Sequence, residues 1–229
     1  MTTNTTTTAT GTTRPSAAQA VAMVAGPALL LAGFATHPAE GDNPEETLRT
    51  ISDHGREWAV SHLLLFAAAA VLIPAVLGLA RVVGGRHRRN ASIAAGLVVF
   101  AMVGLGGAAV AEQLLGVAAT LDGDRAAMVR LAEAAESTPA FLSMAVLPQV
   151  AVVLGFLTMA WALLRSKAVP AWAAAAMAVA TIGVVAPEPG RCIGSALLLA
   201  TFVTAVRRSH RAEAAAPARS ASRLTVAAG

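Results

Sequence analysis

The chain has 229 residues, of which 56% are hydrophobic and only 13% are charged, with a mean hydropathy of +0.64. That charged fraction is about half of what soluble domains carry, so the composition excludes an ordinary soluble domain and indicates a membrane protein. A net charge of +4 would otherwise suggest a nucleic-acid ligand, but the arginines lie at the ends of apolar segments, and we therefore predict no nucleic-acid partner.

Residues 1–16 form a threonine-rich stretch with almost nothing apolar to bury. Such a composition cannot offset the entropy that the backbone loses on ordering, so we predict a disordered tail. Arg14 directly precedes the first apolar segment, which places this tail in the cytoplasm by the positive-inside rule.

Six apolar segments follow, each close to the ~20 residues that a helix needs to cross the hydrocarbon core of a bilayer. Their limits are residues 17–36, 58–82, 91–117, 140–164, 169–186 and 191–206. None shows the regular polar stripe of a helix on the surface of a soluble protein. The sequence thus predicts an all-α, polytopic bundle of six transmembrane helices over residues 17–206.

Two stretches between these segments predict short additional helices. In "DNPEETLRTISDHG", Asn43 suits the cap position and Pro44 the first helical position, while Leu48 and Ile51 share one face. In "DRAAMVRLAEAAE", residue Asp124 is the expected cap. We expect both helices to lie on the outer surface of the membrane, with their apolar faces toward it.

The basic residues predict the orientation of the bundle. If the amino terminus is inside, most of them fall on the cytoplasmic side: Arg14, Arg81, Arg86, Arg88, Arg89, Arg165, Lys167, Arg207, Arg208, Arg211, Arg219 and Arg223. Nearly all acidic residues fall on the opposite side. The positive-inside rule therefore favours six spans in the plasma membrane with both termini in the cytoplasm.

Residues 207–229 form a basic carboxy-terminal tail on the cytoplasmic side. Its first arginines, Arg207, Arg208 and Arg211, suit the headgroups of anionic lipids, at ~1 kcal/mol for each residue near the surface. Fixing the topology explains the same residues without any ligand. The lipid bilayer is the only partner that the sequence predicts directly.

Four polar residues are predicted to share one layer near the outer leaflet. A helix rises about 1.5 Å per residue, and counting from the arginine-rich side places His37 and His62 at the outer boundary, Glu112 just beyond it and Gln149 about one turn inside. Interfacial contact with water explains such residues without function. The alternative is an outward-facing polar pocket, and the sequence leaves both interpretations open.

One pattern favours the burial of Glu112. It continues a ridge of small residues at intervals of four, formed by Gly104, Ala108 and Gly116. Small residues on a membrane helix usually face neighbouring helices, and a carboxylate on such a face needs a partner. A histidine of the polar layer is the expected partner, by hydrogen bond or by charge.

Metal, haem and catalytic chemistry are alternative roles for the same residues. His37, His62 and Glu112 match the ligand types of a catalytic zinc site, but they lie on separate helices without an HExxH motif. Haem would need two facing histidines, and the two candidates lie at the rim. No nucleophile motif occurs. We predict no metal, no cofactor and no catalytic residue.

Prolines and tryptophans in the segments have structural explanations. Pro74 and Pro148 lie inside predicted spans, where a proline removes a helical hydrogen bond and produces a kink. Trp58, Trp161 and Trp172 lie near predicted span ends. Tryptophan is enriched at membrane interfaces, so all three are predicted to be interfacial anchors.

Three short motifs carry a family resemblance. They are "THP" after the first segment, "EWAVSHLLLF" at the start of the second and "LGLAR" at its end. In these motifs, mainly over residues 17–90, the chain resembles a broad group of actinobacterial six-span integral membrane proteins of unknown function. The resemblance implies a membrane location and a helical fold, and it implies no activity.

The sequence favours a non-enzymatic membrane protein that binds or passes a small molecule, or serves as a membrane partner, through its outer half. The alternative is a membrane-embedded enzyme that uses the two histidines and the glutamate of the polar layer for metal binding or proton transfer. Between that layer and the arginine-rich turns, the polar residues are few beyond Gln149, Thr158 and Thr181. This scarcity argues against an open ion channel.

Overall fold

The computed structural model describes residues 14–41, 43–119 and 124–214, and within these ranges the chain is helical without strands. The all-α prediction is therefore confirmed. The elements are α1 (Ala17–Thr36), α2 (Pro44–Asp53), α3 (Gly55–Val82), the 3₁₀ turn η1 (Gly85–His87), α4 (Arg88–Ala119), α5 (Arg125–Glu136), α6 (Pro139–Ser166), α7 (Ala171–Val185) and α8 (Gly190–Ala214). The two predicted tails lie outside the described residues, except for residues 14–16 and 207–214.

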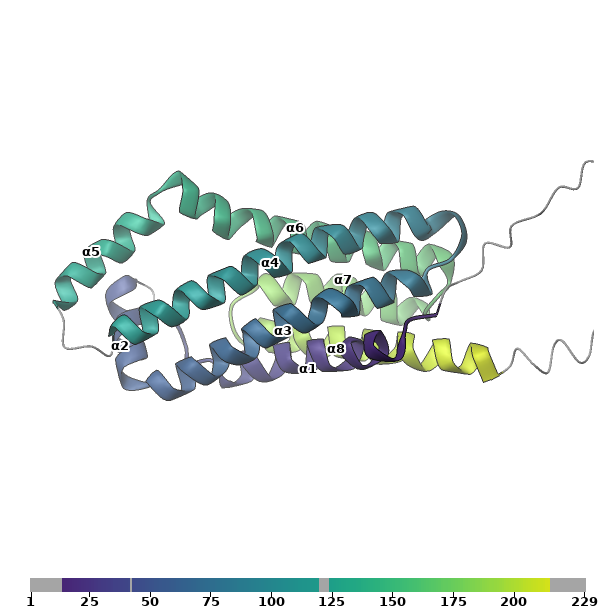
Figure 1. Cartoon of the computed structure of the whole chain (residues 1–229), viewed down its shortest axis with the longest axis horizontal. Coiled ribbons are helices and arrows are strands. Elements are labelled where there is room, and N and C mark those ends of the chain that lie inside the picture. Colours follow the sequence, from purple (N-terminus) through teal and green to yellow (C-terminus); the bar gives the residue numbers. More distant parts are fainter. Residues whose placement is uncertain (1–13, 42, 120–123, 215–229) are drawn as a thin grey trace, which may run out of the picture.

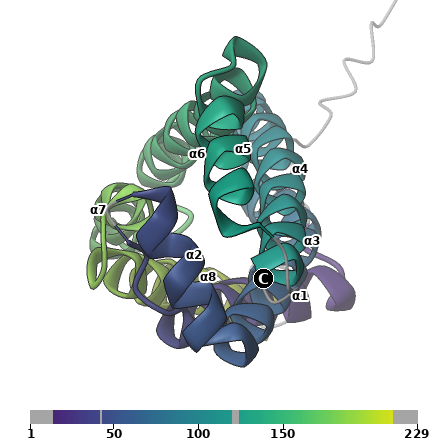
Figure 2. The ribbon, with the colours of Figure 1, turned by 90° about the vertical axis from the view of Figure 1, so that its left-hand side faces the viewer.

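Six of these helices form a closed ring. Each packs against two neighbours in the order α1, α3, α4, α6, α7, α8 and back to α1. Figure 1 shows them side by side along the long axis, and Figure 2 shows the ring from one end, where α2 and α5 cross it. We call this the α2/α5 end. The other end carries the arginine-rich connections and both described chain ends, and we call it the basic end.

Five helices of the described chain, namely α1, α3, α4, α6 and α8, contain stretches that are long and apolar enough to cross a membrane. Helix α7 is apolar but has 15 residues. At 1.5 Å per residue it measures about 22 Å, less than the ~30 Å hydrocarbon core. Pro170 precedes its first residue and the turn at residues 186–189 follows its last, which limits its length.

Close approach of the helix backbones holds the ring together at glycines. A Cβ atom on Gly194 would lie 2.6 Å from the Val184 backbone nitrogen, so α7 and α8 pack backbone to backbone. A Cβ atom on Gly155 would lie 2.7 Å from Val98 Cγ2, which joins α6 to α4. Thr201 Oγ1 also donates a hydrogen bond to Ala173 O at 3.0 Å, between α8 and α7.

The two short helices begin as their caps predict. Asn43 Oδ1 accepts a hydrogen bond from the Glu46 backbone at 2.9 Å, and Asp124 Oδ1 accepts one from the Ala127 backbone at 3.1 Å. The prediction that the apolar face of α2 lies against the membrane is wrong, however, because Leu48 and Ile51 are buried. Helix α2 contacts α3, α4 and α5, so protein rather than lipid covers its apolar face.

The small residues Gly104 and Gly116 on α4 are confirmed to face protein, but the predicted burial of Glu112 on the same ridge is wrong, because its side chain is 53% exposed. Gly104 contacts Pro148 at the interior of α6, and Gly116 contacts Trp58 of α3. A Cβ atom on Gly104 would overlap the rigid Pro148 ring, whereas Gly107, on the same helix, has no atom within 4 Å of the equivalent position.

Replacement of Gly104 by alanine should therefore destabilise the protein by about 1–3 kcal/mol, because α4 and α6 must separate. The matched Gly107→Ala variant should be neutral or slightly stabilising, since alanine is the better helix former. Thermal unfolding of both variants in detergent measures the difference. Equal melting temperatures would show that α4 and α6 do not pack at this point.

Candidate functional site

Three aromatic rings from two elements cluster near the α2/α5 end. Trp58 and His62 lie one turn apart on α3 and stack with ring centroids 4.4 Å apart. His37, which directly follows α1, lies 5.0 Å from each of these rings. Trp58 is only 3% exposed and His62 only 1%. The prediction that Trp58 is an interfacial anchor is therefore wrong, because the protein itself surrounds its ring.

Helix α4 makes the burial of Trp58 possible. The absence of a side chain at Gly116 leaves room for the indole, since a Cβ atom there would lie 2.9 Å from Trp58 Cδ1. The indole Nε1 donates a hydrogen bond to the backbone carbonyl of Glu112 at 3.3 Å. These contacts hold α3 and α4 in a fixed register at the level of His62.

His62 and Glu112 share a proton. The Nδ1 atom of His62 lies 2.8 Å from the Trp58 carbonyl oxygen, which only accepts hydrogen bonds, so Nδ1 carries a hydrogen. The Nε2 atom lies 2.7 Å from Glu112 Oε2, and a contact this short also needs a proton between the atoms. The pair is thus either imidazolium with carboxylate or imidazole with carboxylic acid. Its net charge is zero in both forms.

His37 is held by its own loop. Its Nδ1 atom lies 2.7 Å from the Pro38 carbonyl and donates to it, which leaves Nε2 directed toward Glu40 Oε1 at 3.9 Å. Burial of the ring lowers the pKa of His37 below its usual 6.5, and the nearby His62 lowers it further, against the raising effects of Pro38, Glu40 and Glu112. His37 is therefore mainly uncharged at neutral pH.

An ion pair completes the polar group. Arg191, at the start of α8, places Nη1 3.2 Å from Glu40 Oε1 and its guanidinium 5.7 Å from the centroid of the Phe34 ring. Glu40 and Arg191 are not among the site residues predicted from the sequence. Only weak sequence features indicate these two residues. Glu40 follows His37 by three positions, and Arg191 follows the "PEPG" turn on the same predicted side of the membrane.

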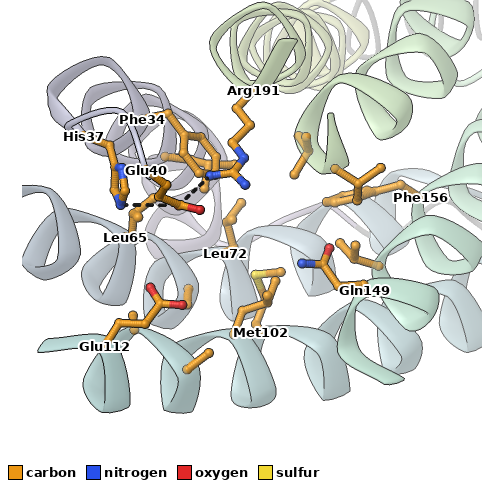
Figure 3. A pocket seen from close by; sticks show the side chains of 18 residues that line it. Phe34, His37, Glu40, Leu65, Leu72, Met102, Glu112, Gln149, Phe156 and Arg191 are labelled. Atoms are coloured by element: carbon orange, nitrogen blue, oxygen red, sulfur yellow. Dashed lines mark hydrogen bonds and ion pairs between the residues drawn. The ribbon is translucent and has the colours of Figure 1, made fainter. Parts of the chain in front are cut away.

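Five polar residues line a central cavity of about 220 Å³: His37, Glu40, Glu112, Gln149 and Arg191. All six ring helices line it, together with the loop after α1. Figure 3 shows Glu112 of α4 and Gln149 of α6 on one side and His37, Glu40 and Arg191 on the other. Its deeper wall is apolar and includes Leu30, Leu65, Leu72, Met102 and Phe156. We call the five polar residues the rim.

The structure brings the four residues of the predicted polar layer into one neighbourhood. His37, Glu112 and Gln149 line the cavity directly. His62 lies behind the rim and holds Glu112 by a hydrogen bond. Among the described residues, no group of three or more His, Cys, Asp or Glu side chains is arranged to hold a metal ion. Both nitrogens of His62 are already occupied by hydrogen bonds.

No protein-family model matches the chain, and neither does any curated protein or any solved structure. The resemblance of residues 17–90 to six-span actinobacterial membrane proteins therefore stays a prediction.

The bond between His62 and Glu112 can be tested with a double-mutant cycle. Glu112→Leu leaves Nε2 of the buried His62 without its partner, which should cost about 1–3 kcal/mol of unfolding free energy. His62→Leu combined with Glu112→Leu should cost less than the sum of the two single changes, with a coupling of about 1–3 kcal/mol.

The exposed pair Arg130 and Asp124, at 3.8 Å, provides a control cycle in the same protein. Its coupling should not exceed about 0.5 kcal/mol, because solvent screens exposed charges. Chemical denaturation in detergent measures both cycles. Equal coupling energies in the two cycles would show that the bond between His62 and Glu112 is no stronger than an exposed ion pair.

The lowered pKa of His37 predicts a pH dependence of stability. From about pH 6.5 down to the lowered pKa of the folded state, the unfolded chain binds more protons than the folded protein, so stability should decrease as the pH falls through this range. One such group contributes at most about 1.4 kcal/mol per pH unit. Between about pH 7.5 and about pH 5.5, the wild type should lose more stability than a His37→Gln variant. Melting temperatures that fall in parallel would show that His37 does not titrate in this way.

Proposed function

We propose that the chain is a six-span plasma-membrane protein, with both termini in the cytoplasm and the rim facing outward. Helix α7 supports the sixth span, because it packs between α6 and α8 and runs between the same two ends of the bundle. Arginines concentrate at the opposite end from the rim, as in Arg86, Arg165 and Arg208. The positive-inside rule supports this orientation.

We infer that the cavity binds a small, uncharged molecule that has an apolar body and one hydrogen-bonding group. The main support is that the charges at the rim are paired or neutral. Arg191 and Glu40 neutralise each other, Glu112 shares a proton with His62, and His37 is mainly uncharged. A charged ligand would lose its hydration without gaining a counter-charge, whereas a neutral polar group finds several hydrogen-bonding partners.

The dimensions of the cavity limit the ligand. At ~30 Å³ per water molecule, a volume of 220 Å³ holds about seven waters. It lies below the ~300 Å³ at which pockets for drug-sized ligands begin. A single ring system or a short chain fits, with its apolar part against Leu65, Leu72 and Phe156 and its polar group near Glu112 and Gln149.

The packing between the cavity and the basic end favours binding of a ligand over its passage through the protein. Toward the basic end, the interior of the ring is filled with fully buried apolar side chains such as Leu79, Val98, Leu163 and Phe202. A polar solute that crossed this region would lose its hydrogen bonds to water without replacement. The cavity is therefore proposed as a binding site that opens at one end.

A naphthalene series tests the proposed ligand class in protein reconstituted into lipid nanodiscs. 1-Naphthol should raise the melting temperature by several degrees at concentrations well above its Kd, because it binds only the folded state. Naphthalene, the anion 1-naphthoate and the cation 1-naphthylmethylammonium should each have smaller effects, since they lack the hydrogen-bonding group or carry an uncompensated charge.

Two variants control for partitioning of the probe into lipid. Ala108 lines the cavity, so Ala108→Phe fills it and should abolish the response to 1-naphthol. Ala111, on the same helix, is exposed and does not line the cavity, so Ala111→Phe should preserve the response. If the two variants respond alike, or if the charged probes act as strongly as 1-naphthol, the proposed site is wrong.

The 2.7 Å contact between His62 and Glu112 favours one second candidate, a membrane-embedded enzyme that transfers a proton. A glutamate that exchanges a proton with a histidine can protonate or deprotonate a molecule bound at the rim. Glu112→Gln separates the two functions once a ligand is known. It keeps a hydrogen-bonding group but cannot transfer a proton, so binding should survive in both cases and turnover should be lost only in an enzyme.

A further inference from the structure

A second cavity, distinct from the central one, lies at the basic end. It is an open cup of about 520 Å³ between two connections that are far apart in the sequence. One side is formed by the connection from α3 to α4, including Gly84, Arg86 and His87. The other side is formed by the end of α6 and the turn that follows, including Arg165 and Lys167.

Cationic groups line the cup. Arg86, Arg165 and Lys167 line it together with His87, and no acidic residue is among its described lining residues. Arg86 Nε donates a hydrogen bond to His87 Nε2 at 3.3 Å, so this ring nitrogen acts as an acceptor. Arg208 adds a further guanidinium at the edge, because its Nη1 donates to the Lys167 carbonyl at 3.5 Å.

The aromatic ring of Trp161 contacts His87, one of the residues that line the cup. It meets the His87 ring edge-on, with centroids 5.5 Å apart. The positive-inside rule explains why arginines occur in each connection, but it does not require that cations from two connections line one cavity. Cations that line one cavity repel one another, and a bound anion would relieve that repulsion.

The backbone of Lys167 adds an independent observation. It is the only lysine of the chain, and among the described non-glycine residues it alone has a positive φ, of 55°. Glycine or asparagine is the usual residue in this left-handed conformation, because a Cβ atom strains it. Such strain is commonly retained where a side chain has a functional role. The ammonium group of Lys167 would have that role in the cup.

We propose that this cup binds the phosphate group of an anionic ligand. Guanidinium groups form paired hydrogen bonds with phosphate oxygens, and an ammonium group adds a compact positive charge. The volume exceeds that of a lone phosphate and leaves room for an attached headgroup. Trp161 and Leu164 beside the cup are exposed apolar side chains that acyl chains would cover, which favours a phospholipid as the source.

The full chain in nanodiscs of phosphatidylcholine alone is the reference for the test. One arm adds a minor fraction of phosphatidic acid to the bilayer, and the other adds inorganic phosphate to the buffer. The melting temperature should rise in at least one arm, because the ligand binds only the folded state. A response to phosphatidic acid alone identifies a lipid as the source. A response to inorganic phosphate shows that the free ion suffices. No response in either arm overturns the proposal.

Matched variants distinguish binding in the cup from general attraction between an anion and the basic end of the protein. Arg86→Gln with Arg165→Gln removes two cations from the cup and should weaken binding about tenfold or more. Arg88→Gln with Arg89→Gln removes two exposed cations at the same end that do not line the cup, and it should have little effect. Equal losses in the two double variants would overturn the proposal.

The variant Lys167→Gly tests whether Lys167 contacts the ligand or only maintains the structure of the turn. Glycine accepts the left-handed backbone at this position, so the variant should fold at least as stably as the wild type in phosphatidylcholine alone. Its response to the phosphate probe should nevertheless fall. A variant that keeps the full response would show that Lys167 does not contact the ligand, and a binding site formed by this cup would be overturned.

Discussion

Close packing of helix backbones at a few small residues is the constraint on which the other features of this protein depend. Gly104 admits the Pro148 ring, Gly194 admits the backbone of α7, and Gly33 lies against Leu65. Lipid is as apolar as the helices, so packing contacts of this kind rather than a hydrophobic driving force hold membrane helices together. They close the six helices into a ring, and a closed ring has an interior that lipid does not reach.

The ring explains why polar chemistry is concentrated at one level. A buried histidine needs partners for both nitrogens, and His62 finds them in the Trp58 carbonyl and the Glu112 carboxylate. The second carboxylate, Glu40, is paired with Arg191. Each charged side chain among the described residues that line the cavity thus has a partner within the protein, and this pairing is the basis for proposing a neutral ligand.

The two ends of the bundle differ in electrostatic character. Around the rim, opposite charges are paired over short distances, which suits a neutral ligand. In the cup at the basic end, Arg86, Arg165 and Lys167 lie among described lining residues of which none is acidic, which suits a phosphate group. The two sites would therefore recognise different chemistry from opposite faces of a membrane, with a packed apolar interior between them.

Local features of the sequence determined the helices and the depth of their polar residues. Apolar runs, capping residues and the fixed rise per residue act along one chain segment, so α1 occupies the same residues as the first predicted segment, and His37, His62 and Glu112 were expected at one level. Only the tertiary structure decided which side chains meet. Helix rotation and the order of the ring depend on contacts between distant segments, and these bury Trp58, pair Glu40 with Arg191 and join two arginine-rich turns into one cup.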